Sequence, residues 1–168
     1  MSNCRSFMFE RNPVPIEICI EDESKVSFKH LIDLTEASFN LYSKRLKTTS
    51  NDLFESGNKE YDLNNTFIIQ EILEIGDPEN LSLSVTSNGT IHYTVRYLDG
   101  QSLFIETYLN TTDENQTFFE LLDDQKVIFS GDCSMEEGLA EIKRLKNNSS
   151  QREFCFPYNI RQEVNIDC

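Results

Sequence analysis

The stretch LSLSVTSNGTIHYTVRYLDGQSLFIETY, residues 81–108, decides the fold class of this chain. Apolar and polar side chains alternate along it, which is the pattern of strands with one buried and one solvated face. Asn88-Gly89 and Asp99-Gly100 interrupt the alternation, and such dipeptides favour tight hairpin turns in which both residues take positive φ. The stretch therefore predicts three consecutive antiparallel strands.

Two further strands are expected after residue 116. The segments Thr117 to Leu122 and Lys126 to Ser130 flank a turn at Asp123-Asp124. Together with the first three strands they predict an antiparallel meander of about five strands.

Two helices are expected to flank this meander. The first has Ser24 as its N-cap and an apolar stripe with three- and four-residue spacing. The stripe comprises Phe28, Leu31, Ile32, Thr35, Phe39, Tyr42 and Leu46. The second helix begins at a capping box formed by Ser134 and Glu137 and ends at Asn147-Asn148. The predicted fold class is α+β, with a long N-terminal helix and a second helix after the sheet packed on one face.

The N-terminal segment from Phe7 to Ile20 is expected to be extended. Isoleucine alternates with other residues from Ile16 to Ile20, as in a half-buried strand. Pro13 and Pro15 lack a backbone N–H, so they favour an edge position for this strand.

Residues 67–75 fit two structures. The spacing of Ile68, Ile72 and Ile75 and a possible cap at Asn65 favour a helix. The β-branched side chains and the stop at residues 76–78 favour a strand, and the strand is slightly preferred.

The organisation of the chain is expected to be a single acidic domain over residues 1–168, since this length is usual for one domain and 38% of the residues are hydrophobic. Residues 48–65 are polar and could form a flexible connector. The segment 154–168 is apolar enough that we expect it to pack against the sheet or a partner.

The charge balance narrows the possible partners. The chain has 29 acidic and 15 basic side chains, a formal net charge of −14. Such a field opposes direct contact with nucleic acid and with anionic membranes, because both require a basic face. A protein partner with a basic surface is the natural complement.

The cysteines and the N-terminal sequence favour a cytoplasmic location. The five cysteines are widely spaced and form no C-x-x-C pair, which predicts reduced thiols and no disulfide framework. No signal peptide is visible, and no apolar run approaches the roughly 20 residues of a membrane span.

The sequence contains no motif of known catalytic chemistry. Only His30 and His92 could act as histidine bases, and no nucleophile elbow, phosphate-binding loop or dinucleotide motif occurs. The acidic pairs lack the spacing of a calcium loop. We therefore expect no catalytic residue, no cofactor and no metal site, and the chain is predicted not to be an enzyme.

Two candidate interaction surfaces follow from the local charge contrast. The acidic candidate comprises Asp113, Glu114, Glu120, Asp123, Asp124 and Asp132. The basic candidate, on the first helix, comprises Lys25, Lys29, Lys44, Arg45 and Lys47. Complementation of the helix dipole and solvation explain the basic group more simply than docking does. A solvated sheet edge protected by charge explains the acidic group as well as a binding role does.

These features predict a non-enzymatic interaction module, an acidic inhibitor or neutraliser of the immunity, antitoxin or anti-defence type. One alternative comes from the order of elements, which resembles curved-sheet folds such as the cystatin-like proteins. That resemblance implies a pocket for a small molecule or substrate, lined by Tyr93, Tyr97, Phe104 and Tyr108. A second alternative is an assembly or scaffold subunit that uses the apolar C-terminal segment, and a homodimer is possible.

Overall fold

The chain forms a mixed sheet covered on one side by helices. A computed structural model describes residues 3–9, 12–44, 59–109 and 117–154. Its elements are β1 (Asn3–Phe9), β2 (Asn12–Ile20), α1 (Phe28–Lys44), α2 (Lys59–Ile75), β3 (Pro78–Val85), β4 (Thr90–Tyr97), β5 (Gln101–Tyr108), β6 (Thr117–Asp123), β7 (Lys126–Cys133) and α3 (Met135–Phe154).

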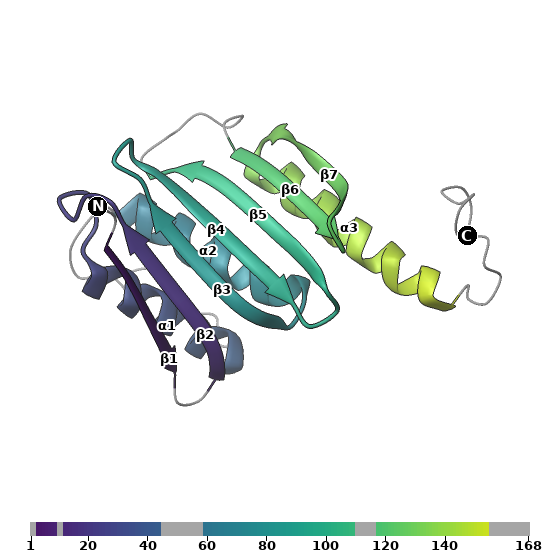
Figure 1. The fold of residues 1–168 in the computed structure, drawn as a ribbon, viewed down its shortest axis with the longest axis horizontal. Helices are drawn as coiled ribbons and strands as arrows, with labels where there is room; N and C mark the ends of the chain where they lie inside the picture. The colour runs from purple at the N-terminus through teal and green to yellow at the C-terminus, as the bar shows by residue number, and fades with distance from the viewer. Residues whose placement is uncertain (1–2, 10–11, 45–58, 110–116, 155–168) are drawn as a thin grey trace.

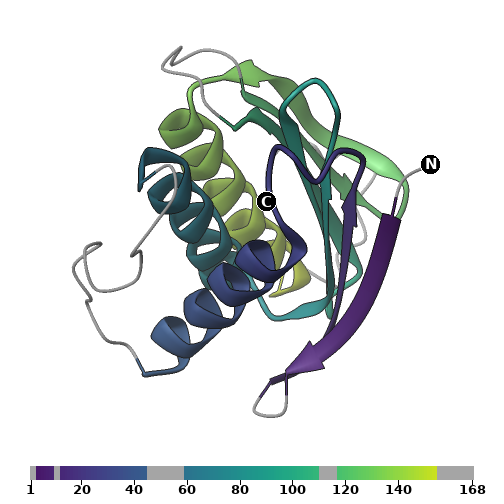
Figure 2. The same cartoon turned by 90° about the vertical axis from the view of Figure 1, so that its left-hand side faces the viewer.

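The seven strands lie side by side in the order of the sequence (Figure 1). Neighbouring strands are antiparallel except β2 and β3, which run parallel and pair from Ile16 with Leu81 to Ile20 with Val85. Helices α1 and α2 make the crossover between these two strands. Figure 2 shows that α1, α2 and α3 all cover the same face of the sheet.

The α+β class and the predicted five-strand meander are confirmed as β3 to β7, but the sheet is larger than predicted. The hairpin of β1 and β2 adds two strands, so the first helix follows two strands and does not open the fold. The strand order was predictable only for the meander, because its turns are local and the β2–β3 pairing is not.

The prolines of β2 lie in an interior strand, so the predicted edge position is wrong. Strand β1 is the edge, and β2 lies between β1 and β3. Pro15 pairs with Met8 of β1, whereas the pairing with β3 begins only at Ile16. Because Pro13 and Pro15 precede the doubly paired part of β2, their missing N–H groups cost no hydrogen bond to β3.

The N-cap of helix α1 lies three residues after the predicted one. The Ser27 hydroxyl accepts a hydrogen bond from the backbone N–H of His30 at 3.2 Å, so Ser27 caps the helix. Ser24 instead donates its backbone N–H to the Asp22 carboxylate at 3.0 Å, in the turn that precedes the helix.

Residues 67–75 belong to helix α2, so the preference for a strand is wrong. Ile68, Ile69 and Ile72 are buried against the sheet and α1, where a broad apolar face replaces the narrow stripe of a surface helix. Residues 59–65 form the start of the same helix and are no connector, whereas 48–58 lie outside the described residues.

Helix α3 begins as predicted and ends later. The Ser134 hydroxyl accepts a hydrogen bond from the backbone N–H of Glu137 at 3.2 Å, which confirms the serine half of the predicted capping box. The helix continues beyond Asn147-Asn148 to Phe154. The expectation that the following segment packs on the sheet concerns residues 155–168, outside the described part of the chain.

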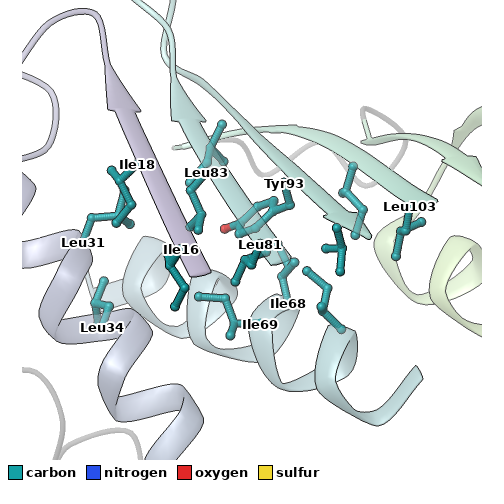
Figure 3. Packing of buried hydrophobic residues seen from close by; sticks show 14 of the residues in the cluster. Ile16, Ile18, Leu31, Leu34, Ile68, Ile69, Leu81, Leu83, Tyr93 and Leu103 are labelled. Carbon is teal, nitrogen blue, oxygen red and sulfur yellow. The ribbon is translucent and has the colours of Figure 1, made fainter. Parts of the chain in front are cut away.

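The core lies between the sheet and the helices, as the side chains in Figure 3 show. Two buried tyrosines of β4 carry polar groups into it. Tyr93 donates its hydroxyl proton to the Asn65 side chain of α2, and Tyr97 donates to the Ile72 carbonyl oxygen at 3.0 Å. Each hydroxyl thus ties the sheet to α2 while its ring fills the core.

Helix α3 approaches the sheet at Gly138. A Cβ atom at this position would lie 2.2 Å from the ring of Phe119, which is fully buried on β6. The glycine is therefore required by the close packing of α3 on the sheet.

We expect Gly138→Ala to lower the free energy of unfolding by about 1 kcal/mol or more, because overpacking outweighs the gain of about 1 kcal/mol in helix propensity. Chemical denaturation measures the change. Gly131→Ala is the matched control, since a Cβ there meets no atom within 4 Å. Equal stability of the two variants would contradict the packing argument.

The hairpin turns differ in which residues take positive φ. In the turns at Asn88-Gly89 and Asp99-Gly100 only the glycines do, Gly89 with φ 83° and Gly100 with φ 90°. Two residues that are not glycine, Asp124 with φ 47° and Gln125 with φ 71°, adopt this conformation in the two-residue turn between β6 and β7. A side chain in this region costs roughly 1–2 kcal/mol relative to glycine.

We predict that Gln125→Gly raises the free energy of unfolding by about 0.5–1 kcal/mol, because glycine relieves the backbone strain but loses more entropy on folding. The midpoint of urea unfolding measures this change. Gly89→Ala should act in the opposite direction, and the space around Gly89 is open, so only the backbone can cause the loss. A lower midpoint for Gln125→Gly would refute the prediction.

Candidate functional site on the helix-free face

The face of the sheet opposite the helices is a candidate binding surface. Alternate residues of each strand point to opposite faces. The residues on the helix side are buried, as in β5, where Leu103 and Ile105 are fully buried. The side chains on the other face include Cys4, Glu17, Cys19, Ser82, Ser84, His92, Thr94, Arg96, Ser102, Phe104, Glu106, Phe118, Glu120, Leu122 and Asp132.

Three rings form an aromatic row across β4, β5 and β6 on this face. The centroids of His92 and Phe104 lie 5.4 Å apart, and those of Phe104 and Phe118 lie 6.2 Å apart in an edge-to-face arrangement. Tyr108, 44% exposed, extends the apolar surface along β5. Each ring therefore contacts its neighbour, and all three rings are half-buried.

The aromatic row is unusual for a solvated sheet face. An antiparallel sheet with one wet face normally alternates apolar and polar residues. Here Phe104 lies between two core residues, and Phe118 precedes the buried Phe119, so both faces of β5 and β6 carry apolar groups. Aromatic side chains concentrated on a surface are typical of protein–protein interfaces.

Three carboxylates border the aromatic row, and we call them the acidic rim: Glu106, Glu120 and Asp132. Glu120 lies opposite Phe104, and both Glu106 and Asp132 lie opposite Phe118. The nearby basic side chains already have acidic partners. His92 Nε2 lies 3.0 Å from a Glu106 oxygen, and Arg96 Nε lies 3.0 Å from a Glu79 oxygen.

The structure divides the acidic residues predicted to form a site. Glu120 and Asp132 belong to the rim, whereas Asp123 and Asp124 are exposed at the β6–β7 turn. Asp113 and Glu114 lie outside the described residues. The prediction missed Glu106 and the aromatic row, although the strand alternation and the hairpin turns contain the signal that places them on one face.

The predicted basic surface is only partly described. Lys25 is exposed before α1, and Lys29 lies 3.9 Å from Asp33 one turn later in the helix, with 90% of its side chain in solvent. The Lys44 side chain, Arg45 and Lys47 lie outside the described residues. Neither described lysine is on the helix-free face.

The predicted aromatic pocket does not form, because its four residues lie on two faces of the sheet. Tyr93 and Tyr97 are buried on the helix side, whereas Phe104 and Tyr108 are on the helix-free face. Strands β4 and β5 pair Tyr93 with Ile105 and Thr94 with Phe104, which places these aromatics on opposite sides.

A row of Ser84, His92 and Glu106 crosses β3, β4 and β5 on the helix-free face. These residue types resemble a hydrolytic triad. An oxyanion hole also needs unengaged N–H groups, and the N–H groups of interior strands pair with neighbouring strands.

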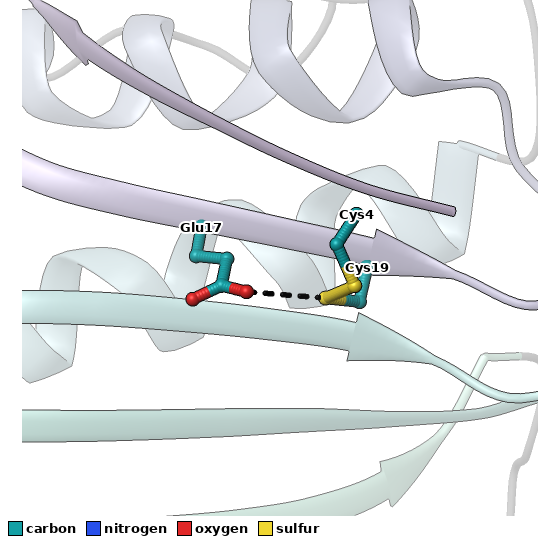
Figure 4. Close-up of a disulfide and its surroundings, with 3 residues drawn as sticks. All are labelled: Cys4, Glu17 and Cys19. Atoms are coloured by element: carbon teal, nitrogen blue, oxygen red, sulfur yellow. Dashed lines mark hydrogen bonds between the residues drawn. A yellow bond between two sulfur atoms is a disulfide. The ribbon is translucent and has the colours of Figure 1, made fainter. Parts of the chain in front are cut away.

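Cys4 and Cys19 form a disulfide on the same face, so the prediction of reduced thiols is wrong for this pair (Figure 4). The two residues lie directly opposite each other in the β1–β2 hairpin, with their Cα atoms 4.0 Å apart. Sequence spacing alone could not reveal this pairing, because it depends on the hairpin register. Cys133 is free and half-buried, and burial, followed by the charges of Glu137 and Asp132, raises its thiol pKa.

A second polar cluster joins α3 to the β4–β5 turn. The Lys146 ammonium lies 2.7 Å from an Asp99 oxygen and 2.9 Å from the Gln101 side-chain oxygen, over the Tyr97 ring. Only 8% of the Lys146 side chain is exposed, so the cluster has a structural role in holding α3 against the β4–β5 turn. Burial alone would raise the pKa of Asp99, but hydrogen bonds from Lys146 and Gln101 and the lysine charge lower it overall.

The lowered pKa of Asp99 predicts a pH-dependent contribution to stability. Its stabilisation is present above the unfolded-state pKa of about 3.9 and is lost as pH falls through the lower folded-state pKa. We expect Asp99→Asn to reduce the free energy of unfolding near neutral pH and to differ less and less from the wild type at acid pH. Urea unfolding between neutral and acid pH measures the difference.

Lys146→Met provides the control background for this measurement. Without the ammonium group, Asp99→Asn should have a much smaller effect at every pH. An undiminished effect in that background would show that the lysine is not the cause.

In comparisons with protein families, curated proteins and solved structures, the chain matches none of them. Within the described residues, no helix has the length and apolar character to span a membrane.

Proposed function

We propose that this chain is a non-enzymatic protein-interaction module that binds a basic partner surface through the helix-free face of its sheet. The observation that carries the proposal is the aromatic row, which is half-buried, is covered by none of the described helices and is bordered by the acidic rim. Aromatic side chains are enriched at protein–protein interfaces, and charges around them help to select the partner.

The charge of the whole chain supports a basic partner. A net charge of −14 steers a cationic surface toward the protein and increases the association rate at low salt. The same charge opposes nucleic acid and anionic membranes as direct ligands. An inhibitor or neutraliser that occupies a cationic cleft is the form of this function that we favour.

A homodimer through this face is disfavoured by its charges. A two-fold symmetric contact brings the same surface of each copy together. The acidic rim would then face a second acidic rim, and like charges at close range cost free energy. The surface therefore suits a partner of different sequence.

A cytoplasmic location belongs to this proposal. Disulfides are rare in that compartment, so the disulfide of Cys4 and Cys19 is the observation that counts against it. Labelling of free thiols in cells that are lysed in acid would measure their state directly.

The proposal predicts that Phe118→Ala and Glu120→Lys each weaken partner binding by about 10-fold or more, because one removes a ring of the aromatic row and the other reverses a rim charge. The partner is captured from the native host with the wild-type chain, purified and titrated with each variant. We expect its net charge to be positive and the dissociation constant to rise between low and physiological salt.

Two exposed residues of the helix layer provide matched controls. Phe67→Ala removes a phenyl ring from α2, and Glu36→Lys reverses a charge on α1. Both should leave the affinity unchanged. The interface would lie elsewhere if Phe118→Ala and Glu120→Lys left the affinity unchanged. It would also lie elsewhere if only Phe67→Ala and Glu36→Lys reduced the affinity.

A further inference from the structure

Three potential metal ligands meet on β1 and β2 at one end of the helix-free face. The sulfur atoms of Cys4 and Cys19 and a carboxylate oxygen of Glu17 all lie within 4.8 Å of one another. Glu17 and Cys19 are two residues apart on β2, so both side chains point to the same face, and Cys4 is directly opposite Cys19. Figure 4 shows the carboxylate turned toward the sulfur pair.

The contact between Glu17 and Cys19 can be a hydrogen bond only after the disulfide is reduced. Cys19 Sγ lies 3.6 Å from Glu17 Oε1, which is the range of a hydrogen bond to sulfur. A sulfur atom in a disulfide has no proton to donate, whereas a thiol does. The carboxylate is therefore close enough to accept a hydrogen bond from the Cys19 thiol once the disulfide is reduced.

We propose that the reduced pair of Cys4 and Cys19, together with Glu17, binds one Zn²⁺ ion. Zinc takes thiolate sulfur at about 2.3 Å and carboxylate oxygen at about 2.0–2.2 Å, in tetrahedral geometry. Two thiolates on one zinc ion then lie about 3.8 Å apart, which opposite residues of an antiparallel pair can reach by side-chain rotation. Three protein ligands leave the fourth position for water.

The disulfide and the metal site exclude each other, because both use the same two sulfur atoms. A dithiol reductant gives two electrons and two protons to the Cys4–Cys19 bond and itself becomes a disulfide. Zinc then displaces the two thiol protons as it binds the thiolates. The hairpin thus has an oxidised form without metal and a reduced form that holds it.

The surroundings favour a cation at this position. Cys4 and Glu17 are exposed, so an ion and a reductant can both reach the site. Two thiolates and one carboxylate carry three negative charges, and Zn²⁺ neutralises two of them in a chain whose net charge is −14. The metal therefore removes a repulsion that would otherwise oppose deprotonation of both thiols.

The test is a titration of the full chain with Co²⁺ as a spectroscopic probe and then with Zn²⁺ in competition. The protein is first reduced with a phosphine, which is then removed without air. We expect one equivalent of Co²⁺ to give sulfur-to-cobalt charge-transfer absorption, and Zn²⁺ to abolish it. The oxidised protein should give no such absorption.

Variants separate this site from the other cysteines. Cys4→Ser and Cys19→Ser should remove stoichiometric binding, and Glu17→Gln should weaken it by at least about 10-fold, since even outer-sphere partners contribute that much. Replacing Cys133, Cys155 and Cys168 together by serine should leave it intact. Circular dichroism confirms that each variant is folded, and Glu17→Gln tests the site even if a cysteine variant is not.

Two results would overturn the proposal. One is a reduced wild-type chain that binds no Co²⁺ or Zn²⁺ at stoichiometric concentration. The other is binding that persists in Cys4→Ser and disappears in the triple serine variant. Neither result concerns the aromatic row, so the metal site and the proposed partner interface are tested independently.

Discussion

The parallel pairing of β2 with β3 is the constraint on which the rest of the structure depends. Antiparallel neighbours can be joined by a short turn, but parallel neighbours require a crossover that returns the chain to the same end of the sheet. Helices α1 and α2 are that crossover. They pack on one face of the sheet, α3 joins them there, and none of the described helices covers the opposite face.

This one-sided covering gives the two faces of each strand different chemistry. Toward the helices, the tyrosines of β4 bury their rings and satisfy their hydroxyls with α2. Away from the helices, Phe104 and Phe118 are packed edge to face and are only half-buried. Aromatic residues thus serve as core on one side and as surface on the other, and only the register distinguishes the two roles.

The meander was predictable because its information is local: alternation defines each strand, and a turn dipeptide separates it from the next. Helix α2 was not, since its broad buried face produces an apolar run that also fits a strand. For the candidate site, the acidic residues Glu120 and Asp132 were predicted, but their common face with Phe118 follows from strand register. The Cys4–Cys19 pair likewise depends on a hairpin that spacing alone does not define.

The hairpin of β1 and β2 has a consequence for how the chain folds. Its contacts are local, whereas Ile16 meets Leu81 only after both crossover helices and β3 have been synthesised, so the long-range pairing is the slower event. An isolated two-stranded hairpin is marginally stable in water. A covalent or metal link between Cys4 and Cys19 would hold the two strands in register during that interval. Strand β2 of the nascent chain would then already be ordered when β3 pairs with it.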